Sequence, residues 1–356
     1  METDQPVTTP TQFDPGTHHF PLARDVAARA GVSTATVSRV LNGTPGVRAD
    51  KREAVLRAVA EMGFVANPAA RALSLRRFRT VGAIIPNIEN DEFIRAVSAF
   101  QNHLRDAGYT LILTNAGYDL DVELREAITL LERGVDGLML VGDNHRPDLY
   151  GRLRRHNVKL IQTFTLSQER DCVGFDNRAV AHRAALYLLD LGHRRIGVVT
   201  GPRTENDRGG ARVDGIRQAL DARSLSIDPA HDITTSYGIG AGRDALRQIL
   251  DAGGPPPTAI ICGTDQFAFG VMIEAQARGV RVPDDLSVIG FNDADYAPFL
   301  SPPLTTVRIH AAEIGRIAGE HLVARMAGEP RVRVTEVPAE LIVRASTAPP
   351  LPERGH

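Results

Sequence analysis

Residues 25–42 read DVAARAGVSTATVSRVLN, and this stretch decides the fold of the first part of the chain. Apolar residues recur at the spacing of one helical face before and after Gly31, which predicts two short helices that pack together. Gly31 suits the left-handed residue that ends a helix, and Ser33 stands where an N-cap hydroxyl is wanted. The outer face of the second helix then carries Thr34, Ala35, Ser38 and Arg39. This is the layout of a helix-turn-helix, whose second helix enters the major groove of DNA.

A helical hairpin inside a larger core would give the same local pattern, but two further features favour nucleic-acid binding. A third helix is expected over residues 49–62, where Val55, Leu56, Val59 and Met62 would close a three-helix core. Residues 20–79 hold 11 Lys and Arg against 4 Asp and Glu, whereas residues 80–356 hold 30 against 36. A basic module attached to an acidic body is the charge distribution expected of a protein with a polyanionic partner.

The next segment, NPAARAL at 67–73, predicts a short helix with Pro near its start. From Asp25 to Leu73 the chain resembles the DNA-binding headpiece and hinge helix of the LacI/GalR family of bacterial regulators. The resemblance rests on AGVSxxTVSRVLNG from residue 30, EMGF from residue 61 and NPxARxL from residue 67. It implies that the hinge helix orders on operator DNA, paired across a dimer. It also implies that Leu73 wedges into the minor groove, which kinks the duplex.

The resemblance also assigns roles within the helix-turn-helix. The family positions that touch base edges fall on Thr34, Ala35 and Arg39, since Arg pairs bidentately with guanine and small methyl groups contact the thymine methyl. A phosphate contact is the other interpretation of Arg39. Phosphate positioning or packing is implied for Ser33, Thr36, Ser38 and Asn42. The family usually opens its first helix with Thr or Ser, whereas Leu22 stands here, so that helix needs another cap.

From Thr80 onward, short apolar runs alternate with amphipathic segments, which indicates an α/β fold. The runs near 81–86, 110–114, 137–141, 159–162, 195–199 and 259–262 are typical of buried parallel strands. Helices are expected near 91–106, 121–133, 178–191, 208–221, 239–250 and 266–278. Two successive series of this kind favour two doubly wound parallel sheets. A (β/α)₈ barrel is the competing architecture, and the loss of strict alternation after Ser287 disfavours it.

The resemblance continues through VGFDN at 173–177, LGHRRI at 191–196 and VPDDLSVIGFND at 282–293. These motifs resemble the effector-binding core of the same family, which is similar to two-lobed periplasmic sugar-binding proteins. The domain organisation that follows is a disordered tail at 1–19, a helix-turn-helix domain at 20–66, a hinge helix and linker at 67–79, an effector-binding and dimerisation domain at 80–346, and a tail at 347–356. The chain is expected to cross between the lobes near 163–166, 291–295 and 322–326.

An effector cleft is implied between the lobes, at the carboxyl ends of the strands. The candidate residues carried over by position are Asn87, Asn90, Phe93, Asp176, Arg212, Tyr237, Asp265 and Asn292. Carboxylates and amides pair with sugar hydroxyls, aromatic rings cover apolar sugar faces, and an arginine suits the carboxylate of a sugar acid. Phe93 fits the core of its own helix equally well. Asn292 stands where many relatives carry Asp, which puts the usual sugar contact in doubt.

Other chemistry finds no support in the sequence. The 11 histidines lack metal-ligand spacing, and the 2 cysteines do not suggest a disulfide framework. The GIGAGR run at 238–243 imitates a dinucleotide fingerprint but carries Arg243 where the third glycine is needed. We therefore expect no catalytic residues, no metal and no cofactor. Without a signal peptide or an apolar run of the ~20 residues that span a bilayer, a cytoplasmic location and no membrane partner are expected.

These observations predict a homodimeric, ligand-responsive transcription regulator that binds a pseudo-palindromic operator in double-stranded DNA. The hypothesis is a repressor of a sugar or sugar-acid utilisation operon, with a sugar, sugar acid or phosphorylated sugar as its effector. The alternative is a sugar-binding transport-type protein, which residues 80–346 alone would suggest. An enzyme on a doubly wound fold is a third interpretation. Neither of these explains the basic module at residues 25–73.

Overall fold

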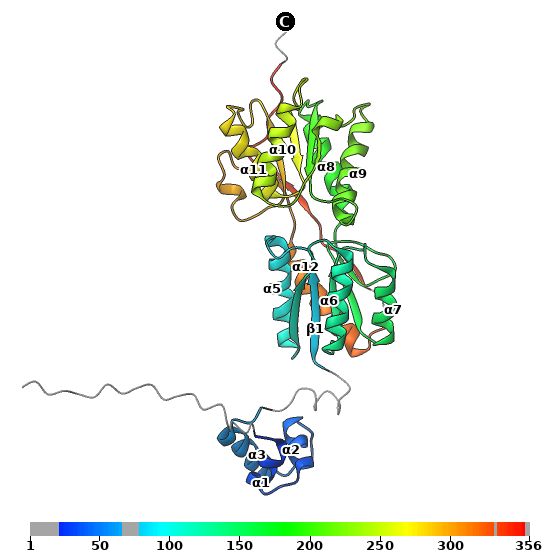
Figure 1. The fold of residues 1–356 in the computed structure, drawn as a ribbon, viewed down its shortest axis with the longest axis vertical. Helices are drawn as coiled ribbons and strands as arrows, with labels where there is room; N and C mark the ends of the chain where they lie inside the picture. The colour runs from blue at the N-terminus through cyan, green and yellow to red at the C-terminus, as the bar shows by residue number, and fades with distance from the viewer. Residues whose placement is uncertain (1–20, 66–77, 331–332, 353–356) are drawn as a thin grey trace, which may run out of the picture. The chain divides into compact units, whose positions relative to one another are not determined.

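The computed structural model describes residues 21–65, 78–330 and 333–352. The chain divides into two compact units, residues 1–78 and 79–356 (Figure 1). The predicted tail at 1–19 and the predicted hinge helix, including Leu73, lie outside the described residues. Among the described residues, no helix has the length and apolar character needed to cross a membrane.

The first unit contains three helices: α1 (Ala23–Ala30), α2 (Thr34–Leu41) and α3 (Ala49–Met62). Gly31 ends α1 in the left-handed region at φ 63°, and the Ser33 hydroxyl caps α2 by accepting from the Thr36 amide at 3.2 Å. The cap that Leu22 cannot supply comes from Asp25, whose Oδ2 accepts from the Leu22 amide at 2.8 Å. The predicted helix-turn-helix therefore forms, and the Asp25 carboxylate caps the start of its first helix.

The core of this unit is built from the predicted faces of α1 and α2, with Val26, Val37 and Val40 buried. From α3 it takes Val55 and Ala58, but Leu56 is 50% exposed and does not join it. The prediction for Leu56 is wrong because it follows Val55 directly, and one helical step turns a side chain about 100° away from the core stripe.

The second unit is built on two six-stranded sheets, as expected, and is not a (β/α)₈ barrel. In the first sheet the order is β11-β5-β4-β3-β1-β2, and in the second it is β12-β10-β9-β8-β6-β7. The first comprises β1 (Thr80–Ile85), β2 (Thr110–Asn115), β3 (Gly137–Val141), β4 (Lys159–Thr163), β5 (Cys172–Gly174) and β11 (Val334–Glu336). The second comprises β6 (Ile196–Thr200), β7 (Asp232–Thr234), β8 (Ala259–Cys262), β9 (Ser287–Asn292), β10 (Thr305–Arg308) and β12 (Glu340–Ile342). The pairing is parallel except between β10 and β12.

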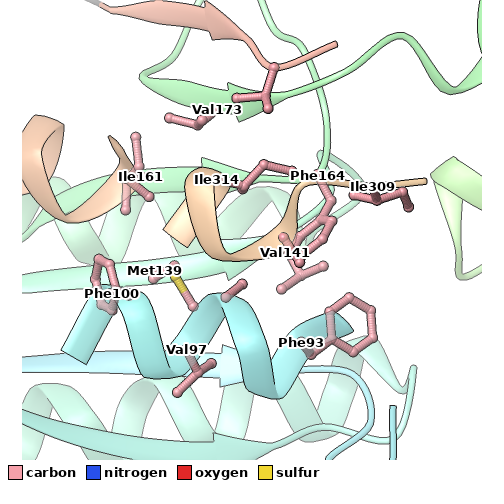
Figure 2. Packing of buried hydrophobic residues seen from close by; sticks show 14 of the residues in the cluster. Phe93, Val97, Phe100, Met139, Val141, Ile161, Phe164, Val173, Ile309 and Ile314 are labelled. Atoms are coloured by element: carbon pink, nitrogen blue, oxygen red, sulfur yellow. The ribbon is translucent and has the colours of Figure 1, made fainter. Parts of the chain in front are cut away.

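Each sheet is flanked by helices and forms one lobe of the unit (Figure 1). The first lobe carries α5 (Asp91–Asp106), α6 (Leu120–Glu132), α7 (Pro147–Arg155) and α12 (Ala311–Ala327). The second carries α8 (Asn177–Asp190), α9 (Asp207–Asp221), α10 (Ile239–Asp251), α11 (Asp265–Ala277) and the short helices η1 (Pro229–His231) and η2 (Ala297–Phe299). Figure 2 shows how residues of α5, such as Phe93 and Phe100, pack with Met139, Ile161 and Ile314 in the core of the first lobe.

The chain crosses between the lobes at 175–176, 309–310 and 337–339, so the expected positions near 163–166, 291–295 and 322–326 are wrong. Strand β5 has only three residues, too few for a recognisable apolar run, and its pairing keeps the chain in the first lobe beyond residue 166. Strand β10 likewise holds the chain in the second lobe beyond residue 295. Helix α12 belongs to the first lobe over its whole length, which moves the third crossing beyond residue 326.

The segment after Ser346 is not a free tail at its start, contrary to the boundary expected there. The Ser346 hydroxyl donates to the carbonyl oxygen of Val288 at 2.6 Å, and the Ala348 amide donates to the Ser287 hydroxyl at 3.0 Å. The Ala348 carbonyl oxygen is also bonded to the His193 imidazole at 2.9 Å. These bonds extend the second lobe to at least residue 348, because short polar side chains satisfy the backbone where the apolar pattern has ended.

Candidate DNA-binding surface and effector cleft

Helix α2 has one buried face and one open face. Val37 and Val40 are buried, whereas Thr34, Ala35, Ser38 and Arg39 are exposed. The Arg39 guanidinium has no hydrogen bond or ion pair within residues 21–65. A long unpaired cation on the open face of such a helix is free to contact a base edge or a phosphate.

The remaining polar side chains of this region hold α2 in place. The Ser33 and Thr36 hydroxyls are bonded to each other at 3.0 Å, and the Asn42 amide donates to the Ser38 hydroxyl at 3.3 Å. These bonds leave the hydroxyls of Ser33 and Thr36 occupied at the start of the helix. They favour a positioning role for these residues over base reading.

In the described part of the first unit, basic side chains outnumber the carboxylates that can pair with them. Its four described carboxylates all have an arginine partner: Asp25 with Arg24, Asp50 with Arg48, Glu53 with Arg57 and Glu61 with Arg29. Arg39, Lys51 and Arg52 have no carboxylate partner within the described part of this unit. These spare cations supply the positive charge that displaces counterions from a nucleic-acid backbone.

A cleft lies between the two lobes of the second unit, and we refer to it as the effector cleft. Its lining comes from both lobes and from one crossing segment: Glu92, Phe93, Tyr118, Phe164, Asn206, Arg208, Arg212, Tyr237, Gly263, Thr264 and Ile309. Among the eight residues expected to bind an effector, Phe93, Arg212 and Tyr237 line it. The lobes meet closely here, because the enclosed space is about 20 Å³, roughly the volume needed for one water molecule.

Aromatic rings form much of the cleft wall. Tyr118 of the first lobe stacks on Tyr237 of the second, with centroids 4.8 Å apart and planes 12° from parallel. Phe93 meets Phe164 edge to face at 5.3 Å (Figure 2). The Tyr237 hydroxyl accepts from the Asn206 amide at 2.9 Å, which fixes the ring. Such faces can cover the apolar side of a sugar ring once the lobes part.

Two arginines make the cleft cationic. Arg212 donates from Nε to Asn177 Oδ1 at 2.9 Å and from Nη1 to the carbonyl oxygen of Gly263 at 3.0 Å. Burial, with the nearby charge of Arg208, lowers the pKa of Arg212 to about 10, so the side chain stays protonated at neutral pH. Arg208 is itself buried and lies 6.0 Å from the centre of the Phe93 ring.

Asp207 is paired with Arg208, whose Nη1 donates to Asp207 Oδ1 at 3.4 Å, and the second carboxylate that faces the two arginines is Glu92. The side chain is buried, and burial raises its pKa to about 7, although the charges of Arg212 and Arg208 act in the opposite direction. At neutral pH it therefore offsets only part of the charge of the two arginines. Arg212 has no ion-pair partner in the described parts of the chain, so its charge is available to an anion.

Beside this lining, polar atoms from both lobes are buried without a hydrogen-bond partner in the described parts of the chain: Asn90 Nδ2, Arg95 Nε and Nη2, Asn292 Oδ1 and the Tyr296 hydroxyl. The segments that carry them meet where Arg95 Nη1 contacts Asp295 Oδ1 at 3.2 Å. A buried polar group without a partner costs about 1–3 kcal/mol. Two of these residues, Asn90 and Asn292, are expected effector residues, although neither belongs to the cleft lining in this arrangement of the lobes.

The other expected effector residues are occupied elsewhere. Asp176 is exposed and caps α8 by accepting from the Ala179 amide at 2.9 Å. Asp265 is buried and accepts from the Thr306 hydroxyl at 2.5 Å and the Ala294 amide at 2.6 Å, and burial raises its pKa to about 6. Asn87 accepts from the Glu89 amide at 2.8 Å. The structure thus gives these three side chains structural bonds and does not bring them to the cleft lining.

Several lining residues escaped the sequence analysis, although a signal for some of them was present. Arg208 lies four residues before Arg212 on α9, which places both on one helical face. Tyr118 and Phe164 follow the carboxyl ends of β2 and β4, where ligands of parallel sheets are expected. Glu92 had no signal of its own, because acidic residues are common in the first turn of a helix for structural reasons.

A basic helix-turn-helix unit and a two-lobed unit with a polar cleft define a class of ligand-controlled DNA-binding regulators. Residues 23–67 match the family described as bacterial regulatory proteins, lacI family, and residues 185–347 match the periplasmic binding protein-like domain. The chain is 32% identical over 327 residues to the HTH-type transcriptional repressor CytR of Escherichia coli strain K12, covering 91% of this chain and 95% of that protein. The chain therefore belongs to the LacI family.

Solved structures agree with this assignment. The transcription regulator GntR from Chromobacterium violaceum superposes with a TM-score of 0.71 at 30% identity, over 75% of this chain and 99% of that one. The lac repressor dimer bound to operator and the anti-inducer ONPF superposes with a TM-score of 0.80 at 24% identity, over 92% and 99% of the two chains. The second likeness shows a shared fold.

The open face of α2 leads to a prediction about base reading. Replacing Arg39 by Ala is expected to relax the base preference at one symmetric pair of operator positions, at a cost of about 1–3 kcal/mol per contact. Arg52→Ala, which removes an unpaired cation from α3, serves as the matched control and is expected to weaken binding to all sequences alike. Binding of base-substituted duplexes, followed by fluorescence anisotropy, separates the two. A uniform loss in Arg39→Ala would make Arg39 a phosphate contact.

Proposed function

We propose that this LacI-family protein is a repressor that binds a pseudo-palindromic operator as a homodimer and is controlled by an anionic sugar derivative in the effector cleft. The observation that carries the proposal is the cleft itself, which combines stacked aromatic rings with two buried arginines; unpaired polar atoms of both lobes are buried in neighbouring segments. Family membership and the helix-turn-helix disfavour the alternative of a transport-type sugar-binding protein, since a transporter has no use for a DNA-reading helix.

The chemistry of the cleft supports a sugar acid or a phosphorylated sugar as the effector class. Hydroxyls would pair with Asn90 and Asn292, and ring faces would lie against Tyr118 or Tyr237. Asp207 pairs with Arg208, but Arg212 has no ion-pair partner in the described parts of the chain and Glu92 is only partly ionised at neutral pH, so a carboxylate or phosphate fits better than a neutral sugar. The target operon would then encode proteins that use this compound.

Exposed apolar side chains support the dimer. Both lobes carry them on the segments that the ion pair of Arg95 and Asp295 joins. In the first lobe Ile88 and Ile94 are 51% and 38% exposed, and in the second lobe Phe299 on η2 is 85% exposed. We propose that a second copy of the chain covers these side chains. The lac repressor, which shares the fold, is a dimer on its operator.

Control of DNA binding requires that the effector distinguish two arrangements of the lobes. The closed lobes leave no room for a sugar, so binding must accompany opening or rearrangement of the cleft. Each tenfold difference in effector affinity between the two arrangements shifts their balance by ~1.4 kcal/mol. The expected wedge at Leu73 and its hinge helix would transmit that shift to the operator.

The experiment that tests this function is selection of genomic fragments by the purified full-length protein, followed by footprinting. We expect a protected pseudo-palindrome with a distorted central step, because two wedged leucines would unstack it. The adjacent genes would then narrow the effector class. Binding without sequence preference, with or without added sugar acids and sugar phosphates, would contradict the proposal.

The apolar side chains shared by the lobes generate a prediction about assembly. Phe299→Asp is expected to shift the protein from dimer to monomer, because it places a charge where the second copy would bury an aromatic ring. Light scattering during gel filtration measures the change. Val343→Asp, which alters another exposed apolar residue of the second lobe, is the control. A dimer that survives Phe299→Asp would remove η2 from the interface.

The charges of the cleft generate a prediction about pH. A sugar acid keeps its carboxylate ionised between pH 6 and 8, whereas Glu92, with a pKa of about 7, gains charge over this range. Ionised Glu92 repels the ligand, so affinity is expected to fall as the pH rises through 7. Calorimetric titration should show this decline in the wild type and a nearly flat profile in Glu92→Gln.

A companion variant checks the cationic side of the same site. Arg208→Gln is expected to weaken binding of a sugar acid about tenfold or more, the scale of a lost charge-assisted pair. Arg223→Gln, at an exposed arginine beyond α9, is the matched control. Unchanged affinity in Arg208→Gln would exclude an anion contact at this residue.

A further inference from the structure

A second cavity lies in the first lobe and shares no lining residue with the effector cleft. Its volume is about 310 Å³, against about 20 Å³ for the cleft, and it is formed by α7, the start of β4, the loop before β5 and the end of α12. Pockets that hold small molecules start at about 300 Å³. This cavity therefore has room for a ligand without any movement of the lobes.

One wall of the cavity is apolar. Leu153 and Val158 are buried, and Leu160 and the ring of Tyr150 extend the wall. The Arg170 guanidinium lies over the Tyr150 ring, 4.2 Å from its centre. This arrangement leaves a planar cation beside an apolar surface, which suits a ligand with a flat ring.

The charged groups of the cavity are unevenly paired. Asp171 is used by Arg325 at 2.8 Å and by the Arg333 amide at 2.7 Å, and Arg170 donates to Asp143 at 3.1 Å. Glu169 approaches Arg170 only to 3.8 Å, and its side chain is largely exposed.

Two cations of the cavity remain without a carboxylate. Lys159 donates to the neutral Asn157 amide oxygen at 2.7 Å, and the Arg154 guanidinium has no hydrogen bond or ion pair within the described ranges. A carboxylate or phosphate that entered the cavity would meet these two groups. The cavity thus offers an anion site at the edge of an apolar wall.

The position of the cavity in the sheet is also informative. Lys159 opens β4, and its amide donates to the Asp136 carbonyl oxygen at 3.1 Å. The Asp136 carboxylate in turn accepts from the Arg79 amide at 2.7 Å, where the chain enters this unit. The cavity therefore lies at the amino ends of the parallel strands, whereas the effector cleft lies at their carboxyl ends.

We propose that this cavity is a second ligand site, for a small organic anion that joins a flat apolar ring to a carboxylate or phosphate. The ring would lie against Tyr150 and Leu153, and the anion would bind Arg154 and Lys159. Hydrogen bonds through Asp136 link Lys159 of the cavity to Arg79, the first residue of the second unit. We therefore expect a ligand in the cavity to alter operator affinity. This last step rests on the proposed function as a DNA-binding repressor.

The binding test uses phenyl phosphate as the probe and the full-length protein, titrated by calorimetry without DNA. Inorganic phosphate and benzyl alcohol carry only one half of the recognised chemistry each and are expected to bind at least tenfold more weakly. Arg154→Ala is expected to weaken phenyl phosphate about tenfold and Lys159→Met similarly, the scale expected for one charge-assisted contact. Arg155→Ala, at the next residue of α7, and Arg208→Gln in the effector cleft are expected to leave it unchanged.

Three results would overturn the proposal: unchanged binding in Arg154→Ala and Lys159→Met, loss of binding in Arg208→Gln, or inorganic phosphate bound as tightly as phenyl phosphate. Arg154 is exposed and unpaired, so its replacement should not unfold the protein, and a thermal melt checks this. The effect on the selected operator is measured separately. Binding at Arg154 with unchanged operator affinity would contradict the coupling alone. Failure to select any operator would contradict the proposed function and leave the calorimetric result standing.

Discussion

The chain crosses between the two lobes of the second unit three times, and these crossings limit how the lobes can move relative to each other. They connect the last two strands at one side of each sheet, which are the edge strand β11 and its neighbour β5 in one sheet and the edge strand β12 and its neighbour β10 in the other. Beside them, Asp293 accepts from Arg308 and from Arg344, each at 2.7 Å, and so ties the end of β9 to β10 and to the segment after β12. Lobes joined at one edge can turn about it but cannot separate, which is the geometry of a hinge.

This constraint bears on the control of DNA binding that we propose for the cleft. Residues from both lobes meet only when the hinge is closed, as in the stack of Tyr118 on Tyr237 and the bond from the Asp143 amide to Asp207 at 2.9 Å. A ligand that opened the cleft would break these contacts between the lobes. Its differential affinity, rather than its affinity alone, sets the shift in population.

The sequence was sufficient for the elements whose chemistry is local. Gly31 and Ser33 determine the helix-turn-helix because a left-handed C-cap and an N-cap hydroxyl are local requirements, and the long apolar runs located the central strands of both sheets. It failed where tertiary pairing decides the outcome. Strand β5 exists because its three residues pair with β4 and β11, and no local pattern marks it, so the positions of the crossings were wrong.

The cleft was predictable to a similar extent. Phe93, Arg212 and Tyr237 line it as the resemblance implied, but position alone could not show that Asp176 would serve as a helix cap or that Asp265 would be held by Thr306. Arg208 and Tyr118 depend on how the second lobe closes on the first. That relation is set by contacts far apart in sequence, which a local pattern does not contain.

The central claim is that an anionic sugar derivative in the cleft controls operator binding. The most direct test is the affinity of the purified full-length protein for its selected operator, measured by fluorescence anisotropy at fixed ionic strength across pairs of sugar acids or sugar phosphates and their neutral parent sugars. We expect at least one anionic member to change operator affinity tenfold or more, while its neutral parent has little effect. Equal effects of the anionic and neutral members, or a change produced only by neutral sugars, would contradict it.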